Sequence, residues 1–140
     1  MKHIKLYEQE QPEHSVSRRE DGSVFFEMWG LNGKLLREDG PAVIKYRPDG
    51  TIELKGWYIN DGRHRVDGPA WIEYRPDGSV LLEIWYLSDL RHREDGPAWI
   101  SYRQDGTIER EVWYWHGEET EVTSLQEFEA WKYLKSVGLV

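Results

Sequence analysis

Two histidines in the same charged setting are the residues of this chain that most resemble catalytic groups. His64 and His92 are each flanked by arginines, and Asp67 and Asp95 follow three positions later. An imidazole beside a carboxylate can serve in acid–base catalysis or bind a metal ion. One histidine and one aspartate are too few ligands for a metal, and the corresponding position of an earlier, similar segment holds Leu36. We therefore expect packing or turn chemistry here, with no metal, no cofactor and no catalysis.

Three arginines suggest a second chemistry, the binding of an anion. They recur at equal spacing, at Arg37, Arg65 and Arg93. A row of guanidinium groups can bind phosphate or carboxylate together with backbone amides at turns. Such a groove, lined also by His64 and His92, would hold a nucleotide or another small anionic ligand. The alternative is a ladder of ion pairs between internal repeats, since aspartates recur with the same spacing at Asp39, Asp67 and Asp95.

Tryptophans are the stronger candidates for a functional surface. Tryptophan and arginine side by side are typical of the residues that dominate binding energy at protein interfaces. The alternative is that long charged side chains cover the indoles and leave nothing to bind. The candidate protein-binding residues are Trp57, Trp71, Trp85, Trp99 and Trp113, together with Glu73 and Glu83.

An internal repeat must position all of these residues. Four tryptophans recur with a 28-residue period and without a slip, at Trp29, Trp57, Trp85 and Trp113. Glycines keep the same interval at Gly22, Gly50, Gly78 and Gly106, and Gly-Pro-Ala triplets begin at Gly40, Gly68 and Gly96. A fixed period of about 20 to 50 residues marks one supersecondary unit repeated in series, in which each unit packs against the next.

Each repeat is predicted to be a β-hairpin. Residues 70–75 and 80–86 are rich in β-branched and aromatic residues. The intervening Pro76-Asp77-Gly78 predicts a three-residue loop with positive φ at the glycine. The expected register pairs apolar residues on one face: Tyr74 with Val80, Ile72 with Leu82, and Ala70 with Ile84. The other face should then carry the five candidate tryptophans beside Lys55, the glutamates and the arginines.

The two ends of the array depart from the repeat. Residues 12–28 are interpreted as half a repeat that acts as an N-terminal cap, and residues 29–117 as the β-repeat array. Arg110 interrupts the apolar pattern of the last strand, where an inward charge can discourage extension of the sheet. The predicted fold class is mainly β: an antiparallel meander of about eight strands with one C-terminal α-helix, in a single domain over residues 1–140.

The C-terminal helix is expected within residues 123–138. Ser124 and Glu127 have the spacing of a capping box, and Gly138 is a plausible terminator. The helix is expected to close the end of the array, the alternative being that its apolar side binds a partner.

Composition excludes several classes of function. The chain has no cysteine, so disulfides, thiolate metal sites and cysteine nucleophiles are excluded. Its formal charge of −8 opposes binding to membranes and direct binding to nucleic acid. The charge either only keeps a sheet-rich protein soluble or provides an acidic surface for a basic partner. Neither a signal peptide nor a membrane span is predicted, so we expect a cytoplasmic protein.

The pattern of one repeat resembles the MORN type of repeat. The residues that carry this resemblance are Trp57-Tyr58, Asp61-Gly62, Gly68, Tyr74, Asp77-Gly78 and Glu83 with Trp85. The longer segment Arg63–Ala70 and its counterpart Arg91–Ala98 resemble repeats in proteins of bacteriophages and large DNA viruses, and the similarity spans residues 14–117. The resemblance implies a β-repeat fold, and its members include lipid-associated scaffolds and antitoxin-like proteins.

The expected function is therefore binding rather than catalysis. We expect a phage-encoded protein that inhibits or modulates a host protein of the defence or nucleic-acid-processing machinery through its repeat surface. Two alternatives stay open: sequestration of a small anionic ligand by the arginines, and a structural, self-assembling component of a virion or scaffold. The sequence leaves the oligomeric state and the partner's identity open.

Overall fold

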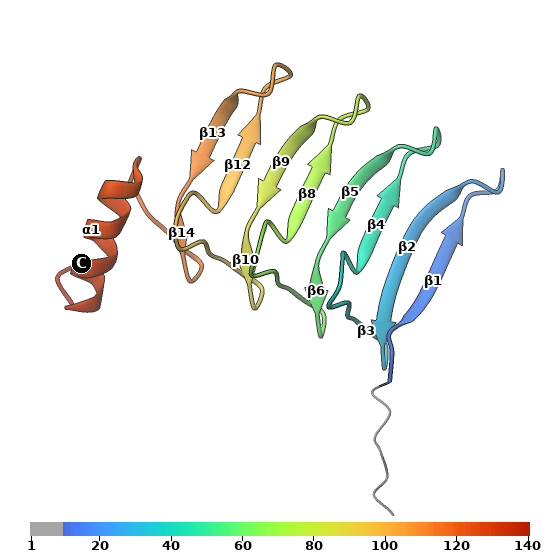
Figure 1. The fold of residues 1–140 in the computed structure, drawn as a ribbon, viewed down its shortest axis with the longest axis horizontal. Helices are drawn as coiled ribbons and strands as arrows, with labels where there is room; N and C mark the ends of the chain where they lie inside the picture. Colours follow the sequence, from blue (N-terminus) through green and yellow to red (C-terminus); the bar gives the residue numbers. More distant parts are fainter. Residues whose placement is uncertain (1–9) are drawn as a thin grey trace, which may run out of the picture.

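A meander of antiparallel strands forms the molecule in the computed structural model, which describes residues 10–140 (Figure 1). The long strands lie in the order β1-β2-β4-β5-β8-β9-β12-β13, so sequence neighbours are also spatial neighbours. Their bounds are β1 (Glu13–Arg18), β2 (Val24–Leu31), β4 (Val43–Tyr46), β5 (Ile52–Gly56), β8 (Trp71–Tyr74), β9 (Val80–Ile84), β12 (Trp99–Tyr102) and β13 (Ile108–Val112). The predicted fold class, eight hairpin-paired strands with one C-terminal helix, is confirmed.

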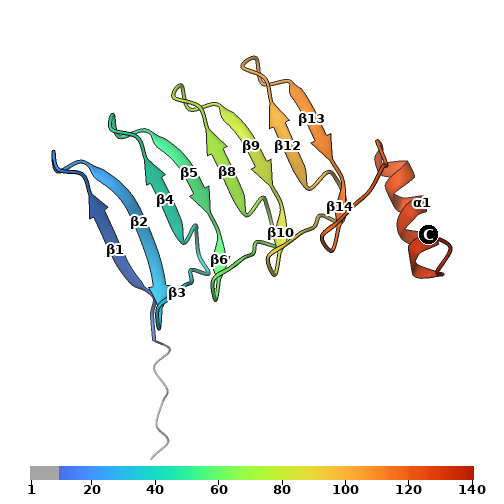
Figure 2. The same cartoon turned by 180° about the vertical axis from the view of Figure 1, so that it is seen from behind.

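Short hairpins hang from one end of the sheet and connect successive repeats (Figure 2). They are built from two-residue strands: β3 (Lys34–Leu35) pairs with β2, β6 (Tyr58–Ile59) with β7 (Gly62–Arg63), β10 (Tyr86–Leu87) with β11 (Leu90–Arg91), and β14 (Tyr114–Trp115) with β15 (Glu118–Glu119). Asn60 and Asp61 take φ angles of 47° and 66°. Positive φ at both central residues is the type I′ geometry that matches the twist of tight hairpins.

The long hairpins turn as the sequence predicts. Arg75 donates its N–H to the Ser79 carbonyl at 2.8 Å, and Gly78, with φ of 86°, donates to the Arg75 carbonyl at 2.9 Å. Asp77 accepts hydrogen bonds from both the amide and the hydroxyl of Ser79, and these bonds lower the pKa of its carboxyl group.

The predicted register is correct at the turn but wrong beyond it. Tyr74 does lie opposite Val80, but Glu73 lies opposite Leu82, so Leu81 is an extra residue on β9. This β-bulge shifts the remaining pairs by one and changes which face each side chain occupies. Ile72 therefore pairs with Glu83 instead of Leu82, and Trp71, not Ala70, pairs with Ile84.

The true register sorts the side chains into continuous rows across the sheet, because directly opposite residues point to the same side. Two neighbouring rows lie on opposite faces. The first, which we call the apolar row, crosses seven strands through Met28, Val43, Gly56, Trp71, Ile84, Trp99 and Val112. The second, the alternating row, lies on the opposite face and contains Glu27, Ile44, Lys55, Ile72, Glu83, Ile100 and Glu111.

The core lies where the short hairpins meet the apolar row. Ala70 is fully buried, Ile84 is 8% exposed and Tyr86 is 4% exposed, and Trp71 and Trp99 pack against this cluster. Small residues are required at the close contacts. A Cβ atom on Gly56 would lie 2.8 Å from the Tyr58 ring.

Hydrogen bonds from one repeat to the next hold the array together at both ends of the strands. At one end, backbone amides of Trp29, Trp57 and Trp85 donate to the carbonyls of Ala42, Ala70 and Ala98 in the following repeat, at 2.8, 2.8 and 2.7 Å. At the other end, Arg19, Arg47 and Arg75 donate from their Nη2 atoms to the carbonyls of Tyr46, Tyr74 and Tyr102. Each arginine also donates from Nη1 to a carbonyl of its own hairpin.

The C-terminal helix α1 (Leu125–Ser136) lies beyond the last short hairpin (Figure 1). Its predicted N-cap is confirmed, because Ser124 accepts from the Glu127 amide at 3.2 Å. The Glu127 carboxylate accepts from the Thr123 amide at 2.7 Å, one residue before the amide that a capping box uses. Gly138 takes positive φ just after the helix ends. Within the described residues, no helix is long and apolar enough to span a membrane.

Candidate protein-binding surface

The apolar row crosses seven strands without a charged side chain, and tryptophans mark its centre. Trp71 and Trp99 flank Ile84, to which both are paired across β8, β9 and β12. Both indoles are partly exposed, and the Trp71 indole donates to the Glu73 carboxylate at 2.9 Å. No second sheet or helix covers this face in residues 10–140 (Figures 1 and 2).

A mixed row borders the apolar row on the same face. It contains Phe26, Lys45, Leu54, Glu73, Leu82, Ser101 and Arg110. Leu82 packs against the buried cluster while part of its surface stays exposed. An apolar strip bordered by polar and charged groups resembles the centre and rim of a protein interface.

Trp57 and Trp85 are not part of the apolar row, because the bulge places Gly56 and Ile84 opposite Trp71 instead. Trp57 still packs against the buried cluster. Each of the two indoles is covered by an arginine of its own repeat. The Arg65 guanidinium carbon lies 4.1 Å from the ring centroid of Trp57, and that of Arg93 lies 4.0 Å from Trp85. Long charged side chains therefore cover these two indoles, which was the alternative that the sequence left open.

The Arg65 guanidinium lies between the Trp57 ring and Gly68, an arrangement that we call the sandwich. Its contacts explain the repeated Arg-x-Asp-Gly-Pro segment. Arg65 donates from Nε to Asp67 at 3.0 Å and from Nη1 to the Pro69 carbonyl at 3.1 Å. A Cβ atom on Gly68 would lie 2.7 Å from the guanidinium carbon, so the glycine makes room for the arginine. Arg37 and Arg93 make the same contacts in their own repeats.

The predicted ladder of ion pairs between repeats is therefore wrong for these residues. Each arginine pairs with the aspartate two positions later in its own repeat. The reason is local, because the turn at Asp-Gly-Pro brings the carboxylate back to the guanidinium. A bridge between repeats is made instead by Arg63 and Asp89, whose atoms are 2.6 Å apart.

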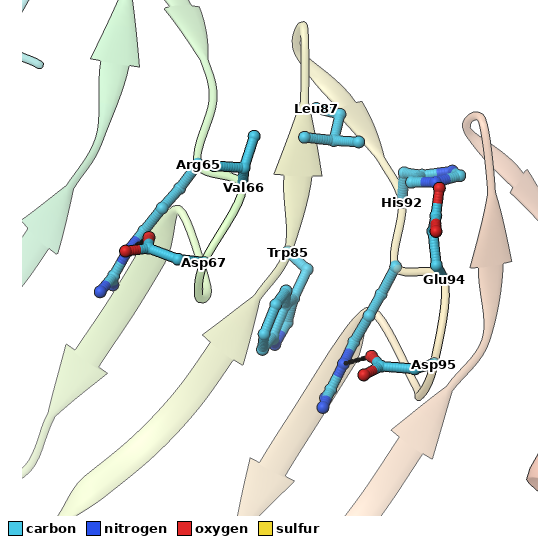
Figure 3. A pocket seen from close by; sticks show the side chains of 9 residues that line it. Arg65, Val66, Asp67, Trp85, Leu87, His92, Glu94 and Asp95 are labelled. Atoms are coloured by element: carbon cyan, nitrogen blue, oxygen red, sulfur yellow. Dashed lines mark hydrogen bonds and ion pairs between the residues drawn. The ribbon is translucent and has the colours of Figure 1, made fainter.

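Shallow grooves separate successive Arg-x-Asp segments, and Trp85 lies in one of about 490 Å³ (Figure 3). Arg65 and Asp67 lie on one side of the indole, and Asp95 lies on the other. Arg93, which pairs with Asp95, also lines this groove. A similar groove of about 630 Å³ lies one repeat earlier, around Trp57. Because the paired carboxylates share these grooves with the arginines, they compete with any anionic ligand for the guanidinium groups.

The histidines join successive repeats through their rings. The Nδ1 atom of His64 accepts from the Ser88 amide, and that of His92 accepts from the His116 amide, both at 3.0 Å. His92 is 3% exposed, and burial lowers the pKa of its imidazole below 6.5. These are packing and turn contacts between successive repeats.

Two more candidate residues lie outside the surface of the apolar row. Trp113 is 5% exposed and lies against Phe128 of α1, with 5.1 Å between ring centroids. Phe128 thus covers Trp113, the last of the four tryptophans that recur every 28 residues. The other three are covered by arginines. Glu83 lies on the opposite face and accepts from the Tyr102 hydroxyl at 3.1 Å, and burial together with this carboxylate raises the pKa of Tyr102 to about 12.

The structure thus brings together Trp71, Trp99 and Glu73 and disperses the other candidates. On this face the structure also places Leu54, Leu82 and Val43, which the apolar pattern alone puts on the other face or does not mark. The same bulge occurs in each long hairpin, so it does not change the 28-residue spacing. The spacing alone therefore cannot show which face these residues occupy.

These features define a single-layer β-repeat protein. Its repeats are joined by the backbone amides of the repeated tryptophans, by the rings of His64 and His92, and by Arg19, Arg47 and Arg75. Comparison with protein-family models, with curated proteins and with solved structures finds no match to the chain.

Proposed function

We propose that this chain is a non-catalytic binding protein that engages another protein through the apolar row and its mixed border. The observation that carries the proposal is the partial exposure of Trp71, Leu82 and Trp99 together on one face of a single sheet. A contiguous apolar strip that faces solvent is a common mark of an interaction site. Aromatic residues in its centre are the ones that contribute most to affinity at interfaces.

The charge of the chain suggests the kind of partner. A formal charge of −8 speeds association with a basic protein and disfavours nucleic acid and anionic membranes. Together with the resemblance to viral repeats, this supports a phage-encoded, cytoplasmic protein that inhibits or modulates a basic host protein, such as a nucleic-acid-processing or defence enzyme.

The test compares two lysine substitutions on one strand. Leu82→Lys places a charge beside the apolar row, whereas Val80→Lys places the same charge on the opposite face of β9, and both residues are partly exposed. Tagged wild-type protein and both variants are used to capture partners from host lysate, with thermal unfolding as a check on folding. We expect a stoichiometric protein with the wild type and Val80→Lys, and its loss with Leu82→Lys. Equal capture by the two folded variants would contradict a role for the apolar row.

A further inference from the structure

The edge of β13 is the one place where the array stops without a following strand of its own kind. Each earlier second strand of a hairpin is paired on its outer side by the first strand of the next repeat: β2 by β4, β5 by β8, and β9 by β12. Gln126 stands one repeat period after Ala98, where another first strand would begin, but this segment is helical. Within residues 10–140, the outer side of β13 has no paired strand.

Two donors that elsewhere hold the next strand recur at this edge. Trp113 is the fourth member of the column whose backbone amides bind the alanine carbonyl of the next repeat. Arg103 is the fourth member of the column whose Nη2 atoms bind the tyrosine carbonyl, and its Nη1 already donates to the Ile108 carbonyl at 2.6 Å. The two donors bracket the length of one first strand, from the alanine to the tyrosine.

We infer that the free edge of β13 is a strand-addition site for an extended segment of a partner protein. The segment has the order small, aromatic, β-branched, acidic, tyrosine, as in Ala70-Trp71-Ile72-Glu73-Tyr74 of the chain itself. Added strands gain affinity from main-chain hydrogen bonds and specificity from side chains on alternate faces.

Three internal examples supply the register and therefore the side-chain preferences. In the pairing of β9 with β12, Ile84, Glu83 and Leu82 face Trp99, Ile100 and Ser101. The corresponding residues of β13 are Val112, Glu111 and Arg110. An aromatic residue thus extends the apolar row past Val112, and a β-branched residue lies opposite Glu111. The acidic residue lies opposite Arg110.

The tyrosine of the segment also has a ready acceptor. Tyr46 donates its hydroxyl to Glu27 at 2.6 Å, and Tyr102 donates to Glu83 at 3.1 Å. Glu111 is the next acidic member of that row and lies exposed on β13. A charged edge discourages indiscriminate pairing, and here the charges favour one pattern of partner over others.

The backbone groups that would bind the segment can be identified. Ala98 donates to the Val112 carbonyl at 3.0 Å, so the peptide groups of Val112 face β12. Because these directions alternate along an antiparallel strand, the N–H and C=O of Glu111 point to the free edge. By the same alternation, the N–H and C=O of Val16 on β1 point away from β2, at the opposite edge of the sheet.

The test uses a synthetic peptide with the sequence of residues 68–78, titrated into the full-length protein labelled with ¹⁵N. Binding should shift and protect the amides of Glu111 and Trp113. Glu111→Pro removes the outward N–H and should weaken binding about fivefold or more, the loss of at least one main-chain hydrogen bond. Val16→Pro makes the same change on the other edge and should leave the affinity unchanged. A peptide with proline in place of isoleucine should not bind.

A charge exchange keeps the test valid should Glu111→Pro disturb the fold. Arg110→Glu should weaken binding of the peptide. A peptide with lysine in place of its glutamate should bind that variant as well as the original peptide binds the wild type. Binding elsewhere on the protein, or none at millimolar peptide, would overturn the inference. Concentration-dependent self-association that shifts β1 and β13 together would identify a second molecule as the occupant and overturn it as well.

The inference rests on the proposed function only in taking the partner to be a protein. The two fail separately. If Leu82→Lys loses the captured protein and the peptide does not bind, the apolar row is supported as an interface and the strand-addition site is refuted. If the peptide binds at β13 and Leu82→Lys captures the same protein as Val80→Lys, the strand-addition site is supported and the role of the apolar row is refuted.

Discussion

Replacing Arg65 tests the sandwich that joins the repeated tryptophan to the Arg-x-Asp-Gly-Pro segment. The guanidinium lies 4.1 Å over the Trp57 ring and donates to the Pro69 carbonyl, while the side chain is 26% exposed. The cation–π contact of a partly exposed arginine contributes about 1 kcal/mol. A hydrogen bond from a charged donor contributes about 1.5 kcal/mol when buried, and less at this exposure. We expect Arg65→Gln to lower the free energy of unfolding by about 2 kcal/mol.

The partner aspartate gives the decisive comparison. The Asp67 side chain is 80% exposed, and exposed ion pairs contribute about 0–0.5 kcal/mol. Asp67→Asn should therefore change the stability little, while Arg65→Lys should lose most of what Arg65→Gln loses, because an ammonium group lacks the flat face that stacks on the indole. Stability is measured by urea unfolding followed by tryptophan fluorescence, with unchanged denaturant slopes required for the comparison. Equal losses for Asp67→Asn and Arg65→Gln would refute the sandwich and restore the ion pair as the main contribution.

Two further predictions concern His92 and Phe128. Burial lowers the pKa of His92 in the folded chain below 6.5, so the unfolded chain binds more protons in the window just below that value. The contribution of neutral His92 to the free energy of unfolding is therefore complete above pH 6.5 and is lost as the pH falls below it. The melting temperature should depend less on pH in His92→Asn than in the wild type. Phe128 is fully buried against Trp113, and Phe128→Ala should cost about 3 kcal/mol and shift tryptophan emission to longer wavelength; an unchanged emission spectrum would contradict its role as the cover of Trp113.

The architecture could be predicted because it depends on signals that repeat. Four glycines at equal spacing imply four equal turns, and Gly78 shows the positive φ that this interpretation requires. The spacing of Ser124 and Glu127 likewise predicts the start of a helix, where Ser124 accepts from the Glu127 amide. Turns and helix caps of this kind form from hydrogen bonds between residues close in sequence, so the sequence alone can predict them.

The site could be predicted only in part, because faces depend on register. Leu81 adds one residue to β9, and this single insertion moves Glu83 to the face opposite Trp71. A bulge that occurs in every repeat preserves the 28-residue period, so the period cannot reveal it. Similarly, whether Arg65 pairs with an aspartate of its own or the next repeat depends on the path of one turn, and the even spacing of both columns allows either.

The contacts between repeats explain why the same residue types serve structure inside the array and become available for binding at its end. Inside, the amide of Trp85 is bound to Ala98, and Arg75 is bound to Tyr102. At the last hairpin, α1 covers the side chain of Trp113 through Phe128, but it replaces the strand that would have paired with β13. The helix thus covers the last of the repeated tryptophans and leaves the outer edge of β13 open. An added strand can pair with this edge in the same register as the first strands of the earlier repeats. The open edge and the apolar row meet at Val112, so a single partner can contact both by adding a strand and placing an aromatic side chain at the end of that row.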